Sequence, residues 1–240
     1  LSGTIANAIR LKRLALIKQG RPDETPEFEG HLNLTFTGSA GQGFGVFMVN
    51  GIETTLWGEA NDSVCKAMSG GLAVIRPKKE ALFRPEENAI IGNCALYGAT
   101  GGRLYVNGLA GDRFAVRNSG AIAVVEGTGL HACEYMTNGM VVILGPVSKN
   151  VGAGMTGGSL ILYGDQGNQI NREYLADSEL SDADLADLKA LLKDYHKHTA
   201  SNRAQAILNG WEDLRSGFRK YEPKKKVALS AVEVGNGVKG

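Results

Sequence analysis

A glycine followed by a short β-type run recurs along the middle of this chain, and its spacing constrains the fold more than any other feature. Four segments share the design: Gly71-Leu-Ala-Val-Ile, Gly120-Ala-Ile-Ala-Val, Gly139-Met-Val-Val-Ile and Gly158-Ser-Leu-Ile-Leu; Gly102-Arg-Leu-Tyr-Val differs only in detail. From position 102 the glycines are 18, 19 and 19 residues apart. The longer step of 31 residues, from 71 to 102, indicates an insertion. A period near 20 built on short apolar strands is typical of a solenoid.

The residues around each glycine form columns that indicate one buried face. Short hydrogen-bonding residues, which can satisfy the backbone of a repeated corner, stand two positions before the glycines: Ser69, Thr100, Asn118, Thr137 and Thr156. Apolar residues stand two and four positions after the glycines: Ala73, Leu104, Ile122, Val141 and Leu160, then Ile75, Val106, Val124, Ile143 and Leu162. Because the two columns are separated by two positions, they share one face of a strand. Stacked between repeats, they predict a continuous inner core.

Each repeat also contains a second short segment before the glycine, which we interpret as another strand. These segments are residues 63–68, 94–99, 113–117, 131–136 and 151–155. Two strands per turn with parallel neighbours make a β-helix, and crossovers between parallel strands are right-handed in nearly all cases. The sequence therefore predicts a mainly β fold: a single-stranded right-handed parallel β-helix with an N-terminal helix and C-terminal helices.

The composition divides the chain into four parts. Residues 1–30 are expected to form a helix and a loop, and residues 31–166 the β-helix. Residues 167–222 are expected to be a helical appendage that packs on the β-helix, and residues 223–240 a tail or a peripheral strand.

Periodicity and caps locate the helices within these parts. Residues 4–19 follow a rough helical period that ends at Gly20. In the appendage, Ser181 is the expected N-cap of one helix, and a second helix begins near Asn202. Their apolar stripes are Leu185, Leu188, Leu192 and Tyr195, then Ile207, Trp211, Leu214 and Phe218. Both stripes are narrow, so each needs a partner: the other stripe, or the end or flank of the solenoid.

Charge and composition exclude several classes of protein. The 240 residues carry a formal net charge of +1, which gives no support for a nucleic-acid or membrane-surface partner. The longest apolar runs are far shorter than the ~20 residues of a membrane span. Basic residues interrupt the first apolar stretch, so we expect no signal peptide. Three cysteines, an odd number, argue against a disulfide scaffold and indicate a reducing, cytoplasmic location.

The run Gly41-Gln-Gly-Phe-Gly45 has the composition of a loop that binds phosphate. A dinucleotide fingerprint requires a following helix and an acidic residue about twenty positions later. Here β-type residues and the Asn50-Gly51 turn follow instead. We therefore interpret this run as a tight solenoid corner.

The cysteines do not have the arrangement of a metal site. Cys65 and Cys133 stand at equivalent positions three repeats apart, which is ~14 Å at the usual strand spacing. Zinc–thiolate bonds are only ~2.3 Å long, so these two sulfurs cannot share a metal. We predict that they and Cys94 are small core residues.

One charged set is a candidate contact surface for another protein. Arg113, Arg117, Glu126 and Glu134 lie in adjacent repeats, and His131 is close to Glu134 in the sequence. The set has two interpretations: cross-strand ion pairing on the solenoid surface, or a surface for a partner domain. The sequence has no nucleophile motif beside paired carboxylates, and His131 has no visible orienting group. We therefore assign no catalytic, cofactor-binding or metal-binding residue.

Seven longer segments closely resemble one known domain. They are Gly38-Ser-Ala-Gly-Gln-Gly-Phe-Gly, Ala60-Asn-Asp, Ser69-Gly-Gly, Ile91-Gly-Asn-Cys-Ala-Leu-Tyr-Gly-Ala-Thr-Gly-Gly, Asp112-Arg-Phe-Ala-Val-Arg-Asn-Ser-Gly, Val124-Val-Glu-Gly-Thr-Gly-Leu-His-Ala-Cys-Glu-Tyr-Met-Thr-Asn-Gly and Ala153-Gly-Met-Thr-Gly-Gly. In this order they resemble the C-terminal Gly-x-Gly-x-Gly domain of the glutamate synthase large (alpha) subunit. With the matches at 202–211 and Phe218, the resemblance covers roughly residues 30–222.

The resemblance implies a right-handed β-helix that carries no catalytic residue. In that family, glutamine hydrolysis belongs to an amidotransferase domain, and glutamate formation belongs to a domain with FMN and an iron–sulfur cluster. The β-helix packs against both and helps to hold them in the geometry that ammonia transfer requires. The expected partners are therefore a glutamine amidotransferase subunit and an FMN-dependent synthase subunit in a hetero-oligomer, with no cofactor in this chain.

Two departures from the family leave alternatives open. Neither an amidotransferase nor an FMN domain is present in the sequence, so we expect a separate subunit or an excised domain. Comparable separate chains occur in N-methylglutamate synthase-type systems and, more distantly, as one of the subunits of formylmethanofuran dehydrogenase; an autonomous ligand-binding β-helix is a further alternative. Ser63, Cys65 and Ala67 stand where the family usually has a tyrosine and two glycines, which leaves the particular enzyme open.

Overall fold

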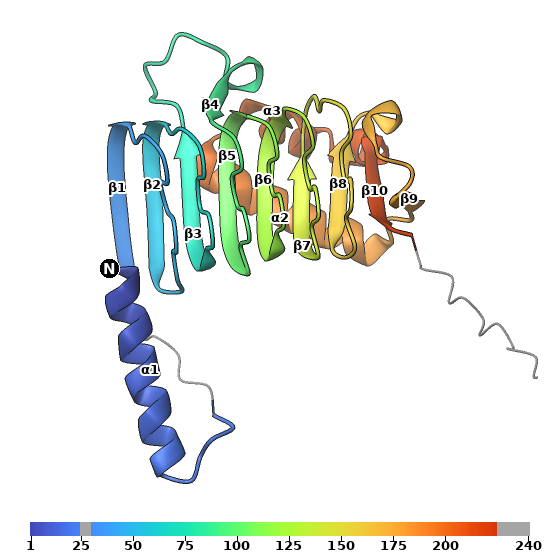
Figure 1. Ribbon diagram of the computed structural model, residues 1–240. Coiled ribbons are helices and arrows are strands. Elements are labelled where there is room, and N and C mark those ends of the chain that lie inside the picture. Colours follow the sequence, from blue (N-terminus) through green and yellow to red (C-terminus); the bar gives the residue numbers. More distant parts are fainter. Residues whose placement is uncertain (25–29, 225–240) are drawn as a thin grey trace, which may run out of the picture.

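Parallel strands stacked side by side form one long sheet, which is the body of the protein (Figure 1). This computed structural model describes residues 1–24 and 30–224. The strands follow in sequence order, each parallel to the next, and the short β4 (Ala89–Ile91) pairs with β5 at one end. The stacked strands are β1 (Leu32–Ser39), β2 (Ile52–Glu59), β3 (Ser69–Arg76), β5 (Gly101–Ala110), β6 (Ser119–Thr128), β7 (Asn138–Ile143) and β8 (Ser159–Tyr163). The predicted β-solenoid is confirmed, with about seven turns.

The register of the strands confirms the inner columns except in one turn. Two rows of residues face the core, Ala73, Leu104, Ala123, Val141 and Leu160, and Ile75, Val106, Val125, Ile143 and Leu162. In β6 the inward residues are Ala123 and Val125, so the assignment of Ile122 and Val124 was wrong by one position. The cause is that Ile122 pairs with Met140, which makes Ala121, and not Gly120, the equivalent of Gly139.

The segments that precede the strands are turns, so the prediction of a second strand in each repeat was wrong. We call residues 41–47, 63–67, 94–98, 113–117, 131–135 and 150–154 the turn segments. In each of them every second residue has a positive φ, for example 58° at Arg113, 59° at Ala115 and 52° at Arg117. The corner interpretation of Gly41–Gly45 is confirmed, with φ of 66°, 73° and 72° at its three glycines. Adjacent residues such as Val64 and Cys65, or Ala132 and Cys133, are buried together, so the turn segments share the short apolar run of a strand but not its alternation.

The turn segments replace the missing strand hydrogen bonds with another ladder between turns of the solenoid. Arg113 N and Arg117 N donate to the following turn, at Leu130 O (2.7 Å) and Glu134 O (2.8 Å). Ala115 N, between them, donates to the preceding turn, at Ala95 O (2.9 Å). Each turn segment is therefore held to both of its neighbours, although it is not a strand.

A ladder of acidic and amide side chains fixes the beginning of the turn segments. Oδ1 of Asp62 accepts from the backbone N of Asn93 (2.8 Å), and Oδ1 of Asn93 accepts from the N of Asp112 (2.8 Å). Asp112 Oδ1 accepts from the N of Leu130 in turn (2.7 Å). These side chains satisfy donors of the next corner, which explains why Asp or Asn recurs there.

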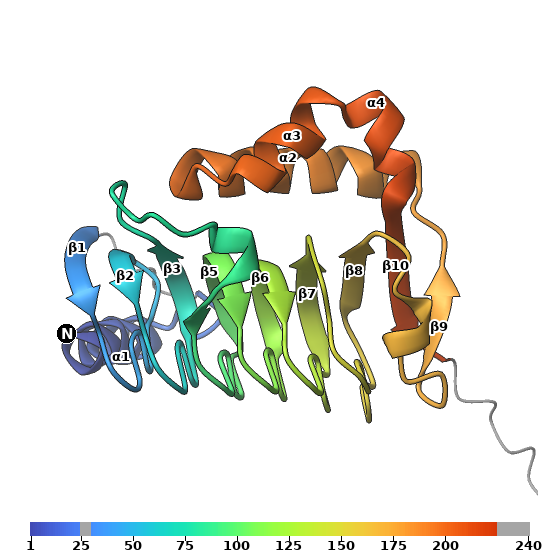
Figure 2. The same ribbon diagram turned by 90° about the horizontal axis from the view of Figure 1, so that it is seen from above.

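Helices cover the outer face of the sheet (Figure 2). They are α2 (Asp182–Thr199), α3 (Asn202–Asn209) and the short α4 (Trp211–Leu214). They cover a second apolar cluster made of outward strand residues and helix residues: Leu72, Val74, Tyr105, Val124, Val142, Leu144, Ile161, Leu188, Leu192, Tyr195, Ala204, Ile207, Trp211 and Phe218. The predicted cap is confirmed, because Ser181 Oγ accepts from Asp184 N (3.1 Å) in a capping box. The helices thus cover the flank of the solenoid.

Phe218 does not continue the helical stripe, and this part of the prediction was wrong. After the 3₁₀ turn η3 (Arg215–Gly217), Phe218 begins the strand β10 (Phe218–Pro223). β10 pairs antiparallel with β8, and β9 (Leu175–Ser178) pairs antiparallel with β10. The C-terminal end of the parallel stack is therefore covered by antiparallel strands. The predicted tail lies outside the described residues from position 225 onward.

The N-terminal end and the insertion complete the fold. The predicted N-terminal helix is confirmed as α1 (Ser2–Lys18). The insertion forms a loop over residues 77–88, with the 3₁₀ turn η1 (Pro85–Glu87), and this loop projects beyond the sheet (Figure 1). A further 3₁₀ turn, η2 (Gly167–Gln169), follows β8. Among the described residues, no helix combines the length and the apolar character needed to cross a membrane.

Close stacking of the corners predicts that two glycine substitutions destabilise the fold by very different amounts. A Cβ at Gly120 would lie 2.2 Å from Thr100 O, whereas at Gly98 (φ +64°) nothing lies within 4 Å. Forcing two turns of the solenoid apart costs roughly 3 kcal/mol, and a left-handed φ alone costs about 1 kcal/mol. We therefore expect Gly120→Ala to lower the urea midpoint strongly and Gly98→Ala only slightly, as followed by circular dichroism. Equal losses would contradict the stacking explanation.

Candidate functional site

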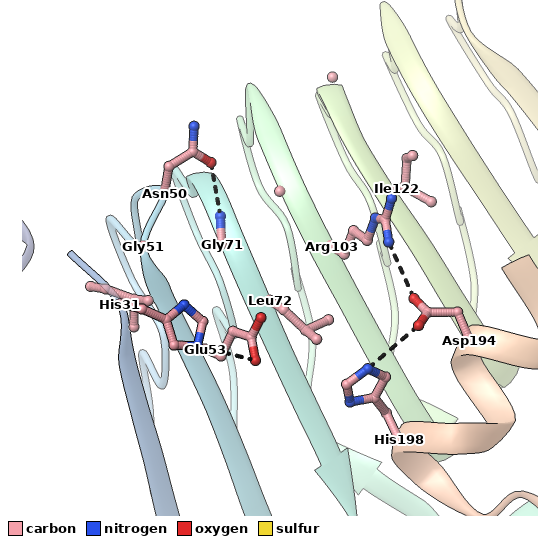
Figure 3. A pocket seen from close by; sticks show the side chains of 13 residues that line it. His31, Asn50, Gly51, Glu53, Gly71, Leu72, Arg103, Ile122, Asp194 and His198 are labelled. Atoms are coloured by element: carbon pink, nitrogen blue, oxygen red, sulfur yellow. Dashed lines mark hydrogen bonds and ion pairs between the residues drawn. The ribbon is translucent and has the colours of Figure 1, made fainter. Parts of the chain in front are cut away.

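A polar groove of about 490 Å³ lies on the outer face of the sheet, where α2 ends (Figure 3). Its floor contains Gly51, Gly71, Gly102 and Gly120 at the beginnings of successive strands. Figure 3 shows the charged side chains on opposite sides of the groove. They are His31 and Glu53 near β1 and β2, Arg103 on β5, and Asp194 and His198 on α2.

The charged groups of the groove are paired with one another. Asp194 Oδ2 accepts from Tyr105 OH (2.7 Å) and from Arg103 Nη1 (3.2 Å), and Asp194 Oδ1 lies 3.5 Å from His198 Nε2. Across the groove, His31 Nε2 lies 3.7 Å from Glu53 Oε2. Burial, with the hydrogen bond to Asp194, raises the pKa of Tyr105, so this phenol stays a neutral donor. These contacts fasten α2 to the sheet, and they do not place a nucleophile beside a base.

Glu126, which the sequence placed in the surface set, is buried beneath the helices. Its side chain is 1% exposed. Glu126 Oε1 accepts from Ser201 Oγ and lies 3.3 Å from Tyr195 OH, which also lies 2.9 Å from Val106 O. Burial raises the pKa of Glu126. The carboxyl group therefore belongs to the seam between the sheet and its helical cover, away from the other candidates.

The same seam fixes the turn between α2 and α3. Asn107 Nδ2 donates to Thr199 O (3.1 Å), and Arg76 Nη1 donates to His198 O (3.1 Å). Ala200 between these helices has a φ of 53°, in the left-handed region. The carbonyl groups that end α2 are thus satisfied by side chains of the sheet. The sequence carried no sign of these contacts, because each joins residues about 90 or more positions apart.

The other four candidates lie together on the turn segments. Arg113 Nε lies 2.8 Å from Glu134 Oε2, so these two residues form an ion pair, between turn segments and not between strands. Arg117 lies over the ring of Tyr135, with 5.9 Å between the guanidinium carbon and the ring centroid. His131 Nδ1 lies 2.9 Å from Asn150 Nδ2. The histidine is therefore held by a neighbouring corner amide.

Exposed aromatic residues share this face, and the sequence analysis missed them. Phe47 is 62% exposed and Tyr135 is 50% exposed, although both lie within turn segments. Lys66 Nζ lies 5.4 Å from the centroid of the Tyr97 ring. We call Lys66, Tyr97, Arg113, Arg117, Glu134 and Tyr135, with Phe47 and His131, the turn face. Five of the eight, Phe47, Arg113, Arg117, His131 and Tyr135, have a positive φ, a backbone geometry that a search for period-two alternation does not reveal.

The prediction of core cysteines is confirmed for Cys65 and Cys133 and was wrong for Cys94, which lies outside the core cluster. Cys65 and Cys133 are buried in turn segments, and burial raises the pKa of both thiols to about 12. They are therefore neutral at physiological pH. Cys94 is partly exposed. In the parts of the chain that the structure describes, no group of three or more His, Cys, Asp and Glu side chains is placed to hold a metal ion.

These features define a glycine-rich parallel β-solenoid domain with a helical cover. The chain belongs to the GXGXG motif family, which it matches over residues 20–224. It is 50% identical over 200 residues to ferredoxin-dependent glutamate synthase 2 of Synechocystis sp., covering 82% of this chain and 13% of that protein. It is 41% identical over 239 residues to the glutamate synthase [NADPH] large chain of Bacillus subtilis, covering 97% of this chain and 15% of that protein.

A third relative extends the similarity to eukaryotes. The glutamate synthase [NADH] of Schizosaccharomyces pombe is 43% identical over 233 residues, which is 95% of this chain and 11% of that protein. The chain thus spans 11–15% of the length of these relatives. The resemblance to a glutamate synthase region is confirmed.

Buried Glu126 predicts a specific pH dependence of stability. The pKa of Glu126 is raised in the folded state. The contribution of Glu126 to the free energy of unfolding is therefore complete below its pKa in the unfolded chain, about 4.3. This contribution is lost as the pH rises through the pKa of the folded state. Glu126→Gln removes this titration. Its melting temperature should therefore rise relative to that of the wild type as the pH is raised from 4 to 8. Glu126→Leu leaves the Ser201 hydroxyl without its acceptor and should be about 1–3 kcal/mol less stable than Glu126→Gln at every pH. A difference between wild type and Glu126→Gln that is constant with pH would contradict the assignment.

Proposed function

We propose that this domain is a non-catalytic structural part of a glutamate synthase-type assembly. It holds the glutamine amidotransferase part and the FMN and iron–sulfur part in the geometry that ammonia transfer requires. The observation that carries the proposal is the 41–50% identity to glutamate synthases over most of this chain. These relatives favour glutamate synthase over the N-methylglutamate synthase and formylmethanofuran dehydrogenase systems.

The pairing of the polar groups supports a structural role. Asp194, Glu126 and Glu134 all contact donors that fasten helix to sheet or turn to turn. A transferred ammonia molecule is lost if the two active sites separate, so the part that joins them must be stiff. Solenoid turns with hydrogen bonds to both neighbours along strands and turn segments provide this stiffness.

The cofactors belong to the partner parts in this proposal. Iron–sulfur clusters are held by sets of cysteine thiolates, usually four. This chain has three cysteines, and the thiols of Cys65 and Cys133 are buried and neutral. These residues do not fit a cluster, and we derive no redox step in this chain.

The turn face is the surface that we assign to a partner domain. It combines Arg and Tyr side chains, which are enriched among the residues that dominate binding energy. Stacking of Arg117 on Tyr135 and pairing of Arg113 with Glu134 restrict these side chains before binding. Arg113, Arg117, His131 and Glu134 supply the contacts, while Glu126 supports the domain from within.

A chimeric enzyme tests this function. The region of the Bacillus subtilis large chain that matches this chain is replaced by this chain, and glutamate formed per glutamine hydrolysed is measured together with released ammonia. We expect coupled synthesis. The double variant Arg117→Ala/Tyr135→Ala should lower the coupling ratio about 10-fold or more, since loss of an interface hot spot costs about 2 kcal/mol.

The control for the chimera is Lys193→Ala on the exposed side of α2, which should keep the coupling of the parent chimera. Thermal unfolding of the separate chains should place all variants within a few degrees of one another. A folded, flavin-loaded chimera that releases all of its ammonia would overturn the proposal. Equal coupling in the double variant and the control would overturn the role of the turn face.

A further inference from the structure

The two ends of the solenoid differ in how they are covered. At the C-terminal end, β10 and β9 continue the sheet beyond β8 with antiparallel pairing. At the N-terminal end, β1 is the last strand of the sheet and, in the described part of the chain, pairs only with β2. An uncovered strand edge is a template for pairing with another chain, and solenoids normally cover it.

The backbone of β1 presents a regular set of hydrogen-bonding groups to this open side. Leu32 N donates to Gly51 O (2.7 Å) and Ala40 N donates to Glu59 O (2.9 Å), so the even-numbered residues face β2. In a parallel ladder the alternate residues face the other way. The N–H and C=O groups of Asn33, Thr35, Thr37 and Ser39 therefore point away from the sheet.

The inner core is also open at this end. Phe36 pairs with Leu56, which is 1% exposed, yet Phe36 itself is 46% exposed. Its ring packs edge-on against Phe44, with 5.7 Å between centroids. Both residues lie at core positions of the first turn. A further strand paired with β1 would cover them, as neighbouring turns cover the core residues inside the stack. The β1 edge thus has the backbone and the side chains of an interior strand.

Helix α1 begins near the lower end of β1 and projects from there away from the sheet (Figure 1). Ile5 is buried in the core and Ile9 packs against it, but Leu11 and Ile17 are 56% and 48% exposed. A helix of 17 residues gains most of its stability in water from packing along an apolar face. Most of α1 lacks such packing within the described residues, so it too has the character of a docking element.

The positive charge of α1 indicates the chemistry of its partner. Helix α1 carries Arg10, Arg13 and Lys18 and contains no acidic residue, whereas Arg21 beyond its end already pairs with Glu24. A single partner that covers both elements must present acidic groups around an apolar centre to α1.

We propose that the β1 edge and α1 form one docking surface for a heterologous polypeptide, which adds an extended strand to β1 and lays an acidic surface with an apolar centre along α1. Adding a strand to a sheet edge is an established mode of recognition, in which backbone hydrogen bonds supply affinity and alternate side chains supply specificity. The identity of the partner as the neighbouring part of a glutamate synthase-type assembly rests on the function proposed above.

Hydrogen exchange of individual amides tests the surface directly. In the separate chain, the amides of Asn33, Thr35 and Thr37 should exchange fast, and those of Leu34 and Phe36, which face β2, should exchange slowly. In the Bacillus subtilis chimera, the three fast amides should slow by about 100-fold or more, because they are then bonded within a sheet. Mass spectrometry with fragmentation at residue resolution measures both states.

A charge-reversal pair tests the part played by α1. Arg10→Glu/Arg13→Glu should restore fast exchange at Thr35 in the chimera by at least about 10-fold. The matched control Lys193→Glu/Lys197→Glu reverses two exposed charges on α2 and should leave the protection unchanged. Equal effects of the two variants would overturn the role of α1.

The outcomes separate this surface from the proposed function. Coupled glutamate synthesis with fast exchange at Asn33, Thr35 and Thr37 would overturn the docking surface and leave the function standing. Slow exchange at these amides without coupling would support the surface and overturn the function. Slow exchange in the separate chain, with sedimentation as a dimer, would show a second copy at the edge and overturn the heterologous partner.

Discussion

The hydrogen bonds between the backbones of successive turns are the interaction on which the rest of this structure depends. Along the strands they form an ordinary parallel ladder, and along the turn segments they alternate between the preceding and the following turn. The second ladder requires a positive φ at every second residue, and it accepts the cost of left-handed geometry at residues such as Arg113 and Tyr135. The hydrogen bonds along the strands and along the turn segments fix each turn to both of its neighbours. The distance between successive turns then sets the spacing of the surface side chains.

This constraint explains which parts of the fold the sequence predicts. Close stacking at the corners requires glycine at positions such as Gly101 and Gly157, where a Cβ would meet a carbonyl of the preceding turn. The glycines therefore recur once in each turn because the turns stack closely. The sequence could predict the solenoid and its inner columns from this period. The slip at β6 arose because Gly120 is equivalent to the first glycine of the pair, and Ala121 takes the place of the second.

The errors have a common physical origin in long-range contacts. A turn segment has the short apolar run of a strand, but hydrogen bonds to the two neighbouring turns hold it in a backbone with alternating positive φ. Phe218 follows a helical stripe but begins β10, because the edge of β8 is available to pair with it. Glu126 resembles a surface charge in the sequence, and its partner Ser201 is 75 positions away. Each of these outcomes is decided by a neighbour that local sequence does not contain.

The distribution of covered surfaces limits where the proposed partners can bind. The inner face of the sheet is used by the core, the outer face by α2 to α4, and the C-terminal edge by β10 and β9. What is left is the turn face and the N-terminal end, which are separate surfaces built on one stack. In the proposed function, one rigid stack carries both surfaces and so fixes how the partners that bind them are placed relative to each other. A domain that joins two active sites needs this property more than it needs chemistry of its own.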